Sequence, residues 1–282
     1  MTLSEAYNIG KKILEDANIE SSSFDAMCIF NKCFEVDRMS LVEKRNINVS
    51  EEKLETFFSS LNERKNGRPL QYILGSWSFM GNDFFVGEGV LIPRDDTEVL
   101  VRQALKSIEN IKSPKILDLC AGSGTVCISL AKERKDAKVT AVELSDIAFK
   151  YLEKNIVKNA TFNITALKKD IFSRDFNFLE NEFDIIVSNP PYIPSEEINN
   201  LQKEVKLEPT LALDGGNDGL KFYKEILNYW TLFLKSSGKI CVEIGFDQGK
   251  KVSQLFRNAN LYDIIVYKDI NNCDRAVCGT KI

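Results

Sequence analysis

A chain of 282 residues is longer than most single domains, so one large and one small domain are expected. The 37 Lys and Arg residues against 41 Asp and Glu residues give a net charge of -4, which is a poor electrostatic match for a polyanion. The chain contains no histidine, which excludes Ser-His-Asp and Cys-His nucleophile systems and histidine general bases. Its chemistry must use carboxylates, amides, backbone groups or a cofactor.

The cysteines and the apolar runs bear on the compartment. Seven cysteines are scattered without a CxxC pair, so the sequence indicates neither a disulfide framework nor a metal site. No apolar run approaches the roughly 20 residues of a membrane-spanning helix, and the N-terminus lacks the charged-then-apolar order of a signal peptide. We expect a cytoplasmic protein without a membrane span. Small core residues are predicted at Cys28, Cys33, Cys127 and Cys241.

The N-terminal part predicts helices. Residues 21–23 are serines that precede an apolar stretch reaching Phe34, and the apolar residues from Leu54 to Leu61 repeat at helical spacing. Residues 77–92 alternate around a Gly-Asn pair, which indicates a hairpin or an extended linker. We therefore expect a helical domain at residues 1–74, a hairpin or linker at 75–95 and a larger domain at 96–282.

The larger domain shows a different pattern. After a helix that Asp96 or Thr97 would cap, short apolar runs alternate with longer amphipathic segments. Such alternation is typical of an α/β fold with a doubly wound, mostly parallel, Rossmann-like sheet, in which ligands bind at the carboxyl ends of the strands. Strands are predicted at residues 115–119, 138–142, 164–167, 183–188, 239–244 and 262–267.

The first chemical motif is DLCAGSG at residues 118–124, between the first of these strands and a helix expected near Thr125. Glycines allow a tight turn and close approach of a ligand, and free N–H groups at a helix start favour a negative group. Glu143 ends the next strand about twenty residues later, where an acid can bind both hydroxyls of a ribose. The pattern predicts a nucleoside cofactor. The alternative interpretation of the same pattern is a tight strand-to-helix turn followed by an unrelated Glu143 on the surface.

Two common nucleoside ligands are disfavoured. The dinucleotide fingerprint needs a third glycine for close packing of the helix, and position 127 is a cysteine. The sequence has no GxxxxGK[ST] run, so a nucleoside triphosphate has no support.

The second motif is SNPPYI at residues 188–193, directly after the fourth predicted strand. An amide nitrogen or ring amino group is a poor nucleophile because its lone pair is delocalised, so a site that methylates it must accept its N–H bonds and immobilise its plane. Asn189 and the Pro190 carbonyl supply acceptors, the two prolines stiffen the loop, and Tyr192 offers a flat face. The alternative is an ordinary Pro-Pro turn with a packed tyrosine.

These motifs carry a resemblance to a known family. The run Asn-Pro-Pro-Tyr resembles the signature of amino-methyltransferases that act on planar nitrogens, and the flanking blocks resemble the peptide chain release factor N5-glutamine methyltransferases. The resemblance covers most of the chain beyond residue 67. Its blocks include RPLQYILG at 68–75, VLIPR at 90–94, DTE at 96–98, EP at 208–209, GGNDGL at 215–220 and EIG at 243–245.

The resemblance implies methyl transfer from S-adenosyl-L-methionine, leaving S-adenosyl-L-homocysteine, to the glutamine of the Gly-Gly-Gln loop in class 1 translation release factors. It implies a monomer that uses no metal and no nucleic-acid substrate, with the N-terminal helical domain as the docking element. The implied cofactor-binding residues are Cys120, Ala121, Gly122, Ser123, Gly124, Glu143, Ile171 and Asn189. The implied substrate-binding residues are Asn189, Pro190, Pro191 and Tyr192, of which Asn189, Pro190 and Tyr192 are catalytic.

Six positions depart from the family pattern. Asp95 and Asn272, in place of a frequent Pro and Gly, are interpreted as local backbone variations. At the cofactor loop and beyond, Cys120 and Ala121 replace the usual Gly and Thr, Glu143 replaces Asp, and Ile171 replaces an aromatic residue. These last four departures bear on cofactor affinity rather than on the type of reaction. Two alternatives stay open. A nucleic-acid adenine or cytosine amino-methyltransferase could hold a flipped base in the same loop, and a catalytically silent module would bind cofactor without turnover.

Three acidic residues lie outside these two motifs. Glu208 and Asp218 are interpreted as caps of a helix expected at about residues 219–234. Glu243 ends the fifth predicted strand, and a purely structural role is open for it.

Overall fold

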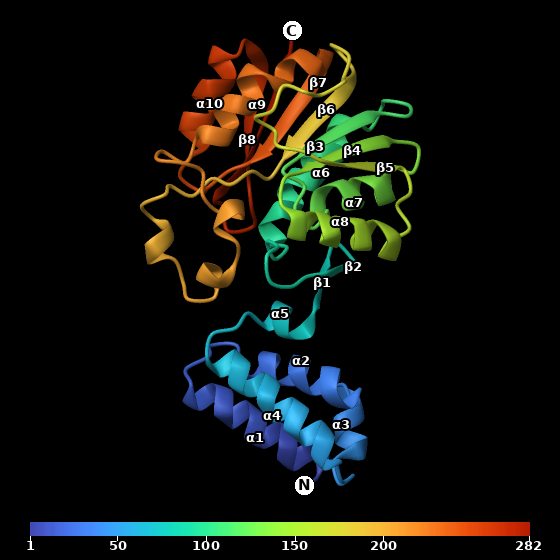
Figure 1. Cartoon of the computed structure of the whole chain (residues 1–282), viewed down its shortest axis with the longest axis vertical. Coiled ribbons are helices and arrows are strands. Elements are labelled where there is room, and N and C mark those ends of the chain that lie inside the picture. The colour runs from blue at the N-terminus through green and yellow to red at the C-terminus, as the bar shows by residue number, and fades with distance from the viewer. The chain divides into compact units, whose positions relative to one another are not determined.

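The computed structural model describes residues 1–282. The chain forms two compact units, Met1–Ser76 with Gln202–Leu207 and Trp77–Leu201 with Glu208–Ile282. The first contains the N-terminal helices, coloured blue to teal in Figure 1, and the second contains the large sheet. None of the helices combines the length and the apolar character that a membrane crossing requires.

The helical unit is built around aromatic side chains. Phe30 contacts Phe57 edge to face, with ring centroids 5.7 Å apart, and both are fully buried. Gly10 lets the first helix approach the fourth, because a Cβ at this position would lie 2.6 Å from the Phe57 ring. The helices predicted in this part are confirmed, and their bounds are α1 Leu3–Asp16, α2 Ser22–Phe34, α3 Arg38–Lys44, α4 Glu51–Lys65 and α5 Leu70–Leu74.

One buried charge cluster joins two distant parts of the chain within this unit. Arg64, which is 4% exposed, donates from Nε to Asp25 Oδ2 at 2.6 Å and from Nη1 to Glu204 Oε1 at 2.7 Å. Asp25 is 2% exposed, whereas Glu204 is partly open to solvent. The Arg64 cluster (Asp25, Arg64 and Glu204) therefore holds the segment Gln202–Leu207 in the helical unit.

The predicted hairpin forms as a two-stranded sheet of β1 Ser76–Phe79 and β2 Asn82–Phe85, and Gly81 takes a φ of +71° at the turn. The large sheet has the order β5-β4-β3-β6-β7-β9-β8. Its strands are β3 Lys115–Leu119, β4 Lys138–Glu143, β5 Ile164–Lys168, β6 Phe183–Ser188, β7 Leu234–Glu243, β8 Leu261–Lys268 and β9 Asp274–Lys281. The neighbours from β5 to β7 run parallel, and β9 is antiparallel to both of its neighbours.

Alternate side chains of each strand enter two separate cores. Ile116 packs in one core with α6, α7 and α8, and Leu117 packs in the other with α9 and α10, as the pleat of a strand requires. Figure 1 shows α7 and α8 on one side of the sheet and α9 and α10 on the other. The doubly wound fold is confirmed. The helix bounds are α6 Glu98–Ser107, α7 Thr125–Glu133, α8 Asp146–Lys158, α9 Lys221–Asn228 and α10 Gly249–Asn258.

Some local predictions were wrong. Ser21 and Thr97 sit at the N-caps of α2 and α6, but neither side chain makes a capping hydrogen bond. The helix expected to reach residue 234 ends at Asn228 and is followed by a 3₁₀ turn at Trp230–Phe233. The strand β9 was not predicted. It places Cys278 opposite Cys241 of β7, with Cα atoms 4.1 Å apart, and the two form a disulfide within the core.

Candidate active site

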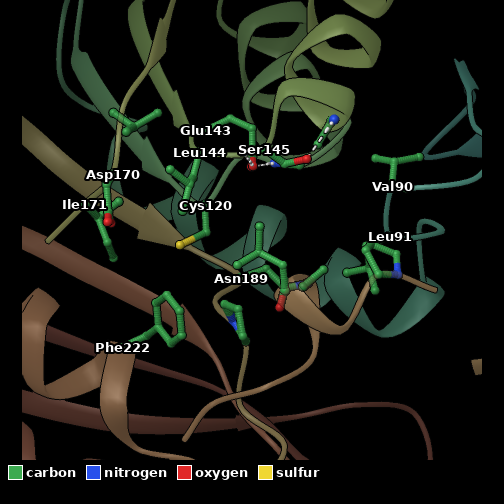
Figure 2. A pocket seen from close by; sticks show the side chains of 18 of the residues that line it. Val90, Leu91, Cys120, Glu143, Leu144, Ser145, Asp170, Ile171, Asn189 and Phe222 are labelled. Atoms are coloured by element: carbon green, nitrogen blue, oxygen red, sulfur yellow. Dashed lines mark hydrogen bonds between the residues drawn. The ribbon is translucent and has the colours of Figure 1, made fainter. Parts of the chain in front are cut away.

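The main cavity opens at the carboxyl ends of four parallel strands. Cys120 follows β3, Glu143 ends β4, Asp170 lies beyond β5 and Asn189 follows β6, and all four line the cavity. Its volume is about 880 Å³ including the open mouth, which suits a nucleoside-sized ligand. Figure 2 shows these side chains around one space. The edge of the sheet predicted from the sequence is therefore where the cavity lies.

The glycine loop turns through left-handed backbone conformations. Gly122 has a φ of +58°, and a Cβ there would meet no atom within 4 Å, so the space beside it is open to a ligand. Gly124 has a φ of +89°, and a Cβ there would lie 2.7 Å from Leu152. Cys120 takes a φ of +62°, a conformation in which glycine is the unstrained residue.

Asp118 fixes the loop to the helix that follows. It is 1% exposed, and its Oδ2 accepts a hydrogen bond from the backbone N–H of Cys127 at 3.0 Å. Burial raises the pKa of Asp118 to about 8. The carboxyl thus holds the first turn of α7 against the end of β3.

Glu143 is held by backbone groups rather than by a cation. Its Oε2 accepts from Gly122 N–H at 2.8 Å and its Oε1 accepts from Ser145 N–H at 2.7 Å. Burial raises the pKa of Glu143, and hydrogen bonding from the backbone of Ser145, Gly122 and Leu144 opposes that effect. Each oxygen of a carboxylate can accept more than one hydrogen bond, so acceptor capacity remains for the hydroxyls of a ribose. With 8% exposure, Glu143 is not the surface residue of the alternative interpretation.

Asn189 stands where the main cavity meets a smaller one of about 380 Å³. Its Nδ2 donates to Thr97 Oγ1 at 3.3 Å, so the nitrogen end of the carboxamide is held by the protein. Pro191 lines the main cavity. The oxygen end of the Asn189 carboxamide is then the group available to a substrate N–H.

Tyr192 belongs to the support of the loop, since neither Tyr192 nor Pro190 lines either cavity. Burial raises the pKa of the Tyr192 hydroxyl far above its usual range. The Tyr192 carbonyl accepts from Gln248 Nε2 at 2.9 Å, and a Cβ at Gly215 would lie 2.7 Å from Tyr192 Cα. These contacts hold the loop in one conformation.

The other predicted cofactor residues are divided between the cavities. Ile171 lines the main cavity, Cys120 and Gly122 line both, Ala121 and Ser123 line the smaller one, and Gly124 lines neither. Ile171 is 4% exposed, and its carbonyl accepts from Trp230 Nε1 at 3.1 Å.

Two aromatic residues of the cavity were missed. Phe172 and Phe222 contact each other edge to face with centroids 5.3 Å apart, and both line the main cavity. They supply flat apolar surface where the sequence has Ile171 in place of an aromatic residue. Phe172 directly follows Ile171 in the sequence, so this aromatic residue of the cavity could have been found from the sequence. Phe222 comes from α9, about fifty residues further on, and no local pattern marks it.

The capping role predicted for Glu208 was wrong. Glu208 accepts from the backbone N–H of Ile92 at 3.0 Å and pairs with the Arg94 guanidinium, so it holds the segment that leads into the smaller cavity. Asp218 accepts from the Leu220 N–H at 3.0 Å, but Leu220 is itself the N-cap of α9 and the helix has no side-chain capping hydrogen bond, so the capping role predicted for Asp218 was also wrong.

Comparisons with known proteins agree with this geometry. The family model for the PrmC N-terminal domain matches residues 5–75, and the model for the methyltransferase small domain matches residues 95–206. The release factor glutamine methyltransferase of Clostridium botulinum is 36% identical over the full length of both chains. That of Caulobacter vibrioides is 35% identical over 100% of this chain and 97% of its own. The chain belongs to the release factor glutamine methyltransferase family.

Solved structures show how widely the fold of this family is shared. A methyltransferase from Pyrococcus furiosus is 17% identical, with a TM-score of 0.52 over 72% of this chain and 91% of that one. The hMettl16 catalytic domain in complex with an RNA hairpin is 13% identical, with a TM-score of 0.59 over 84% of each chain. At these identities the likeness is one of fold alone.

Proposed function

We propose that this chain transfers a methyl group from S-adenosyl-L-methionine to the side-chain amide nitrogen of the glutamine in the Gly-Gly-Gln loop of class 1 release factors. The observation that carries the proposal is Asn189, whose nitrogen is bound to Thr97 and whose oxygen is left to accept an amide N–H at the meeting of two cavities. Membership of the release factor glutamine methyltransferase family supports the choice of acceptor.

The residues of the main cavity fit the cofactor. Glu143 would accept from the ribose hydroxyls, because each of its oxygens accepts one short backbone hydrogen bond and can accept a further one. The open space at Gly122 would take the methionine part close to the backbone, and Phe222 would cover the flat base. When bound, S-adenosyl-L-methionine supplies a methyl group on a positively charged sulfur, and its transfer to the amide nitrogen releases one N–H proton.

The protein's part in the reaction is to hold a weak nucleophile in place. Asn189 Oδ1 would accept from one N–H bond of the substrate amide, which orients its nitrogen and raises its electron density. The Pro190 carbonyl is the second acceptor predicted from the sequence, but Pro190 lines neither cavity in the structure. Pro191 limits the backbone freedom of the loop, and the hydrogen bond that the Tyr192 carbonyl accepts from Gln248 holds the loop in place. No histidine enters this scheme, since the chain contains none.

The helical unit would bind the release factor at a distance from the glutamine. A single side chain offers too few atoms to give affinity and discrimination together, so further contacts are needed. We also propose that Ser123 and Gly124 support the loop at residues 118–124 that would bind the cofactor.

We propose a monomer that acts in the cytoplasm, where translation takes place.

The direct test is to incubate the full chain with methyl-labelled S-adenosyl-L-methionine and purified release factor, and to locate the label by mass spectrometry. Label on the glutamine of the Gly-Gly-Gln loop is the expected result, and a release factor with that glutamine changed to alanine should take up none. In parallel incubations with duplex DNA or RNA in place of the release factor, label on the nucleic acid would favour the amino-methyltransferase alternative instead. Cofactor binding without label on any acceptor would indicate the silent module.

A further inference from the structure

Glu243 is a buried carboxyl that lies next to Asn189 but lines neither cavity. The strands β6 and β7 are parallel, and their register pairs Ser188 with Val242. The next residues are Asn189, which directly follows β6, and Glu243, which ends β7. Because neighbouring parallel strands end at the same edge of the sheet, the two side chains emerge side by side.

In the hydrogen bonding around this pair, Asn189 and Thr97 donate and Glu243 accepts. Asn189 Nδ2 donates to Thr97 Oγ1 at 3.3 Å, and Thr97 is 3% exposed. Burial raises the pKa of Glu243 to about 7, and hydrogen bonding from Thr97 and Asn189 opposes that effect. Glu243 Oε2 is buried and has no hydrogen-bond partner, so this oxygen can accept from a neighbouring donor.

Other charged groups surround the carboxyl. The charge of Arg275 lowers the pKa of Glu243, and that of Asp96 raises it. Arg275 Nη2 is 3.2 Å from Asp96 Oδ2, so the nearest cation is shared with another acid. The remaining titratable side chains that face Glu243 are Tyr192 and Tyr223, and the Tyr223 hydroxyl donates to the Glu243 carbonyl at 2.9 Å.

A half-turn that exchanges the oxygen and the nitrogen of a carboxamide leaves its shape almost unchanged. The hydrogen bonds around it must therefore decide which of the two atoms faces a substrate. An ionised carboxylate only accepts, and the Thr97 hydroxyl has one proton to give. If Thr97 donates to Glu243, its lone pair is left for the Asn189 nitrogen, and the Asn189 oxygen must face the other way. A protonated Glu243 would donate and remove this preference.

We propose that Glu243 is a positioning residue that acts through Thr97 to keep the Asn189 carboxamide oxygen turned towards the substrate amide. This inference rests on the proposed function, because the amide acceptor gives the orientation its purpose. Glu243 does not touch substrate or cofactor. Its ionised form sets the direction of the chain of hydrogen bonds that ends at Asn189.

The kinetic test compares Glu243→Gln, Thr97→Val and Thr97→Ser in the full chain with release factor as substrate. We expect Glu243→Gln to lower kcat about 30-fold and Thr97→Val about tenfold, with cofactor Kd within about twofold of wild type. Thr97→Ser keeps the hydroxyl and should recover kcat to within about threefold of wild type. The wild-type kcat should fall as pH drops below about 7, and Glu243→Gln should lose this dependence.

A second measurement does not depend on catalysis. The side-chain NH₂ resonance of Asn189, assigned by its loss in Asn189→Ala, should titrate near pH 7 in the wild type and stay constant in Glu243→Gln. If the wild type methylates no release factor but this titration is present, the proposed function fails and the positioning role stands. An Asn189 resonance that is indifferent to pH and to Glu243→Gln overturns the inference, as does a Thr97→Ser variant as slow as Thr97→Val. If Glu243→Gln does not fold, the comparison of kcat between Thr97→Ser and Thr97→Val tests the inference.

Discussion

The two units of the chain differ in how they hold buried charge. In the helical unit, Arg64 and Asp25 neutralise each other inside the Arg64 cluster. In the sheet unit, the buried Glu208 pairs with Arg94, but three other carboxyls that are at most 8% exposed form no ion pair, and these three gather where β3, β4 and β7 end. These are Asp118, Glu143 and Glu243.

The difference shows what each buried charge is for. The two charges of a buried ion pair neutralise each other, and removing one partner leaves the other charge buried and uncompensated. Such a pair therefore holds the chain segments that carry its two residues together. A buried carboxyl without a cation keeps acceptor capacity and an elevated pKa, and such groups collect at functional sites. We interpret the ion pair of the helical unit as structural and the unpaired Glu143 and Glu243 of the sheet unit as groups that serve the site, whereas Asp118 holds the start of α7.

The largest effect is expected from Arg64→Ala. It leaves Asp25 buried and unpaired, which should lower the free energy of unfolding of the helical unit by about 3–5 kcal/mol. Both tryptophans, Trp77 and Trp230, lie in the sheet unit, so circular dichroism in urea should shift more than tryptophan fluorescence. Lys11→Ala, which breaks an exposed pair with Glu15, is the control and should change little. A loss below about 1 kcal/mol for Arg64→Ala would contradict a structural ion pair.

The next effect is on catalysis, from Asn189→Ala. Removal of the acceptor should lower kcat about 100-fold or more, equivalent to about 3 kcal/mol of transition-state stabilisation. Cofactor affinity, measured by calorimetry, should change little, and Asn258→Ala on the exposed end of α10 is the control. Near wild-type turnover in a folded Asn189→Ala protein would remove Asn189 from the site.

Glu143→Ala tests an unpaired carboxyl that faces the cofactor. It should weaken S-adenosyl-L-methionine binding about 30-fold, or about 2 kcal/mol, because hydrogen bonds to a charged group are lost. The kcat at saturating cofactor should fall less, since contacts to ribose are the same in the ground and transition states. Glu153→Ala, on the exposed face of α8, is the control. Unchanged affinity in calorimetry would rule out the ribose contact.

The pH dependence of stability tests the same carboxyls without a ligand. The pKa values of Asp118 and Glu243 are raised to about 8 and about 7 by burial. The folded state then binds protons more tightly than the unfolded chain, so the free energy of unfolding falls as pH rises from about 4 to about 8. A tenfold difference in proton affinity between the folded and unfolded states corresponds to about 1.4 kcal/mol.

The measurement is urea unfolding at about pH 5 and pH 8, for the wild type and for Asp118→Asn. The wild type should be less stable at the higher pH, and the variant should show a smaller difference. Equal slopes for the two proteins would mean that Asp118 is ionised at both values of pH.

The smallest effect concerns the surface of the helical unit. Met39 and Val42 are 82% and 70% exposed and stand three residues apart on α3, so they share one face. If this unit binds release factor, changing both to Asp should lower kcat/KM for the intact factor about tenfold and leave a Gly-Gly-Gln peptide unaffected. Val157→Asp on α8, where the side chain is 68% exposed, is the matched control. Equal losses on factor and peptide would argue against docking at this face.

Several elements could be predicted because their signal is local. The strands at 115–119 and 183–188 have the predicted bounds, since a buried parallel strand is a short apolar run between polar segments. Glycines at 122 and 124 mark left-handed turns that other residues avoid. The placing of Glu143 at the end of the next strand also followed from spacing alone.

The missed features depend on partners far along the chain. The strand β9 carries no continuous apolar run and is fixed by pairing with β7 and β8 on either side. Glu208 looked like a cap because the position of Ile92 could not be known from the sequence. The segment Gln202–Leu207 joins the helical unit through Glu204 of the Arg64 cluster, and Lys203 lies beside Gly67.

The sequence by itself determined the class of fold, the cofactor loop and the Asn-Pro-Pro-Tyr loop, because turns, caps and strand periodicity act between residues close in the chain. The tertiary structure alone decided what surrounds these loops. Phe222 reaches the cavity from α9, and Thr97 and Glu243 reach Asn189 from two other elements. Burial, and with it the pKa of a carboxyl, is set by atoms from the whole fold, so no local pattern contains it.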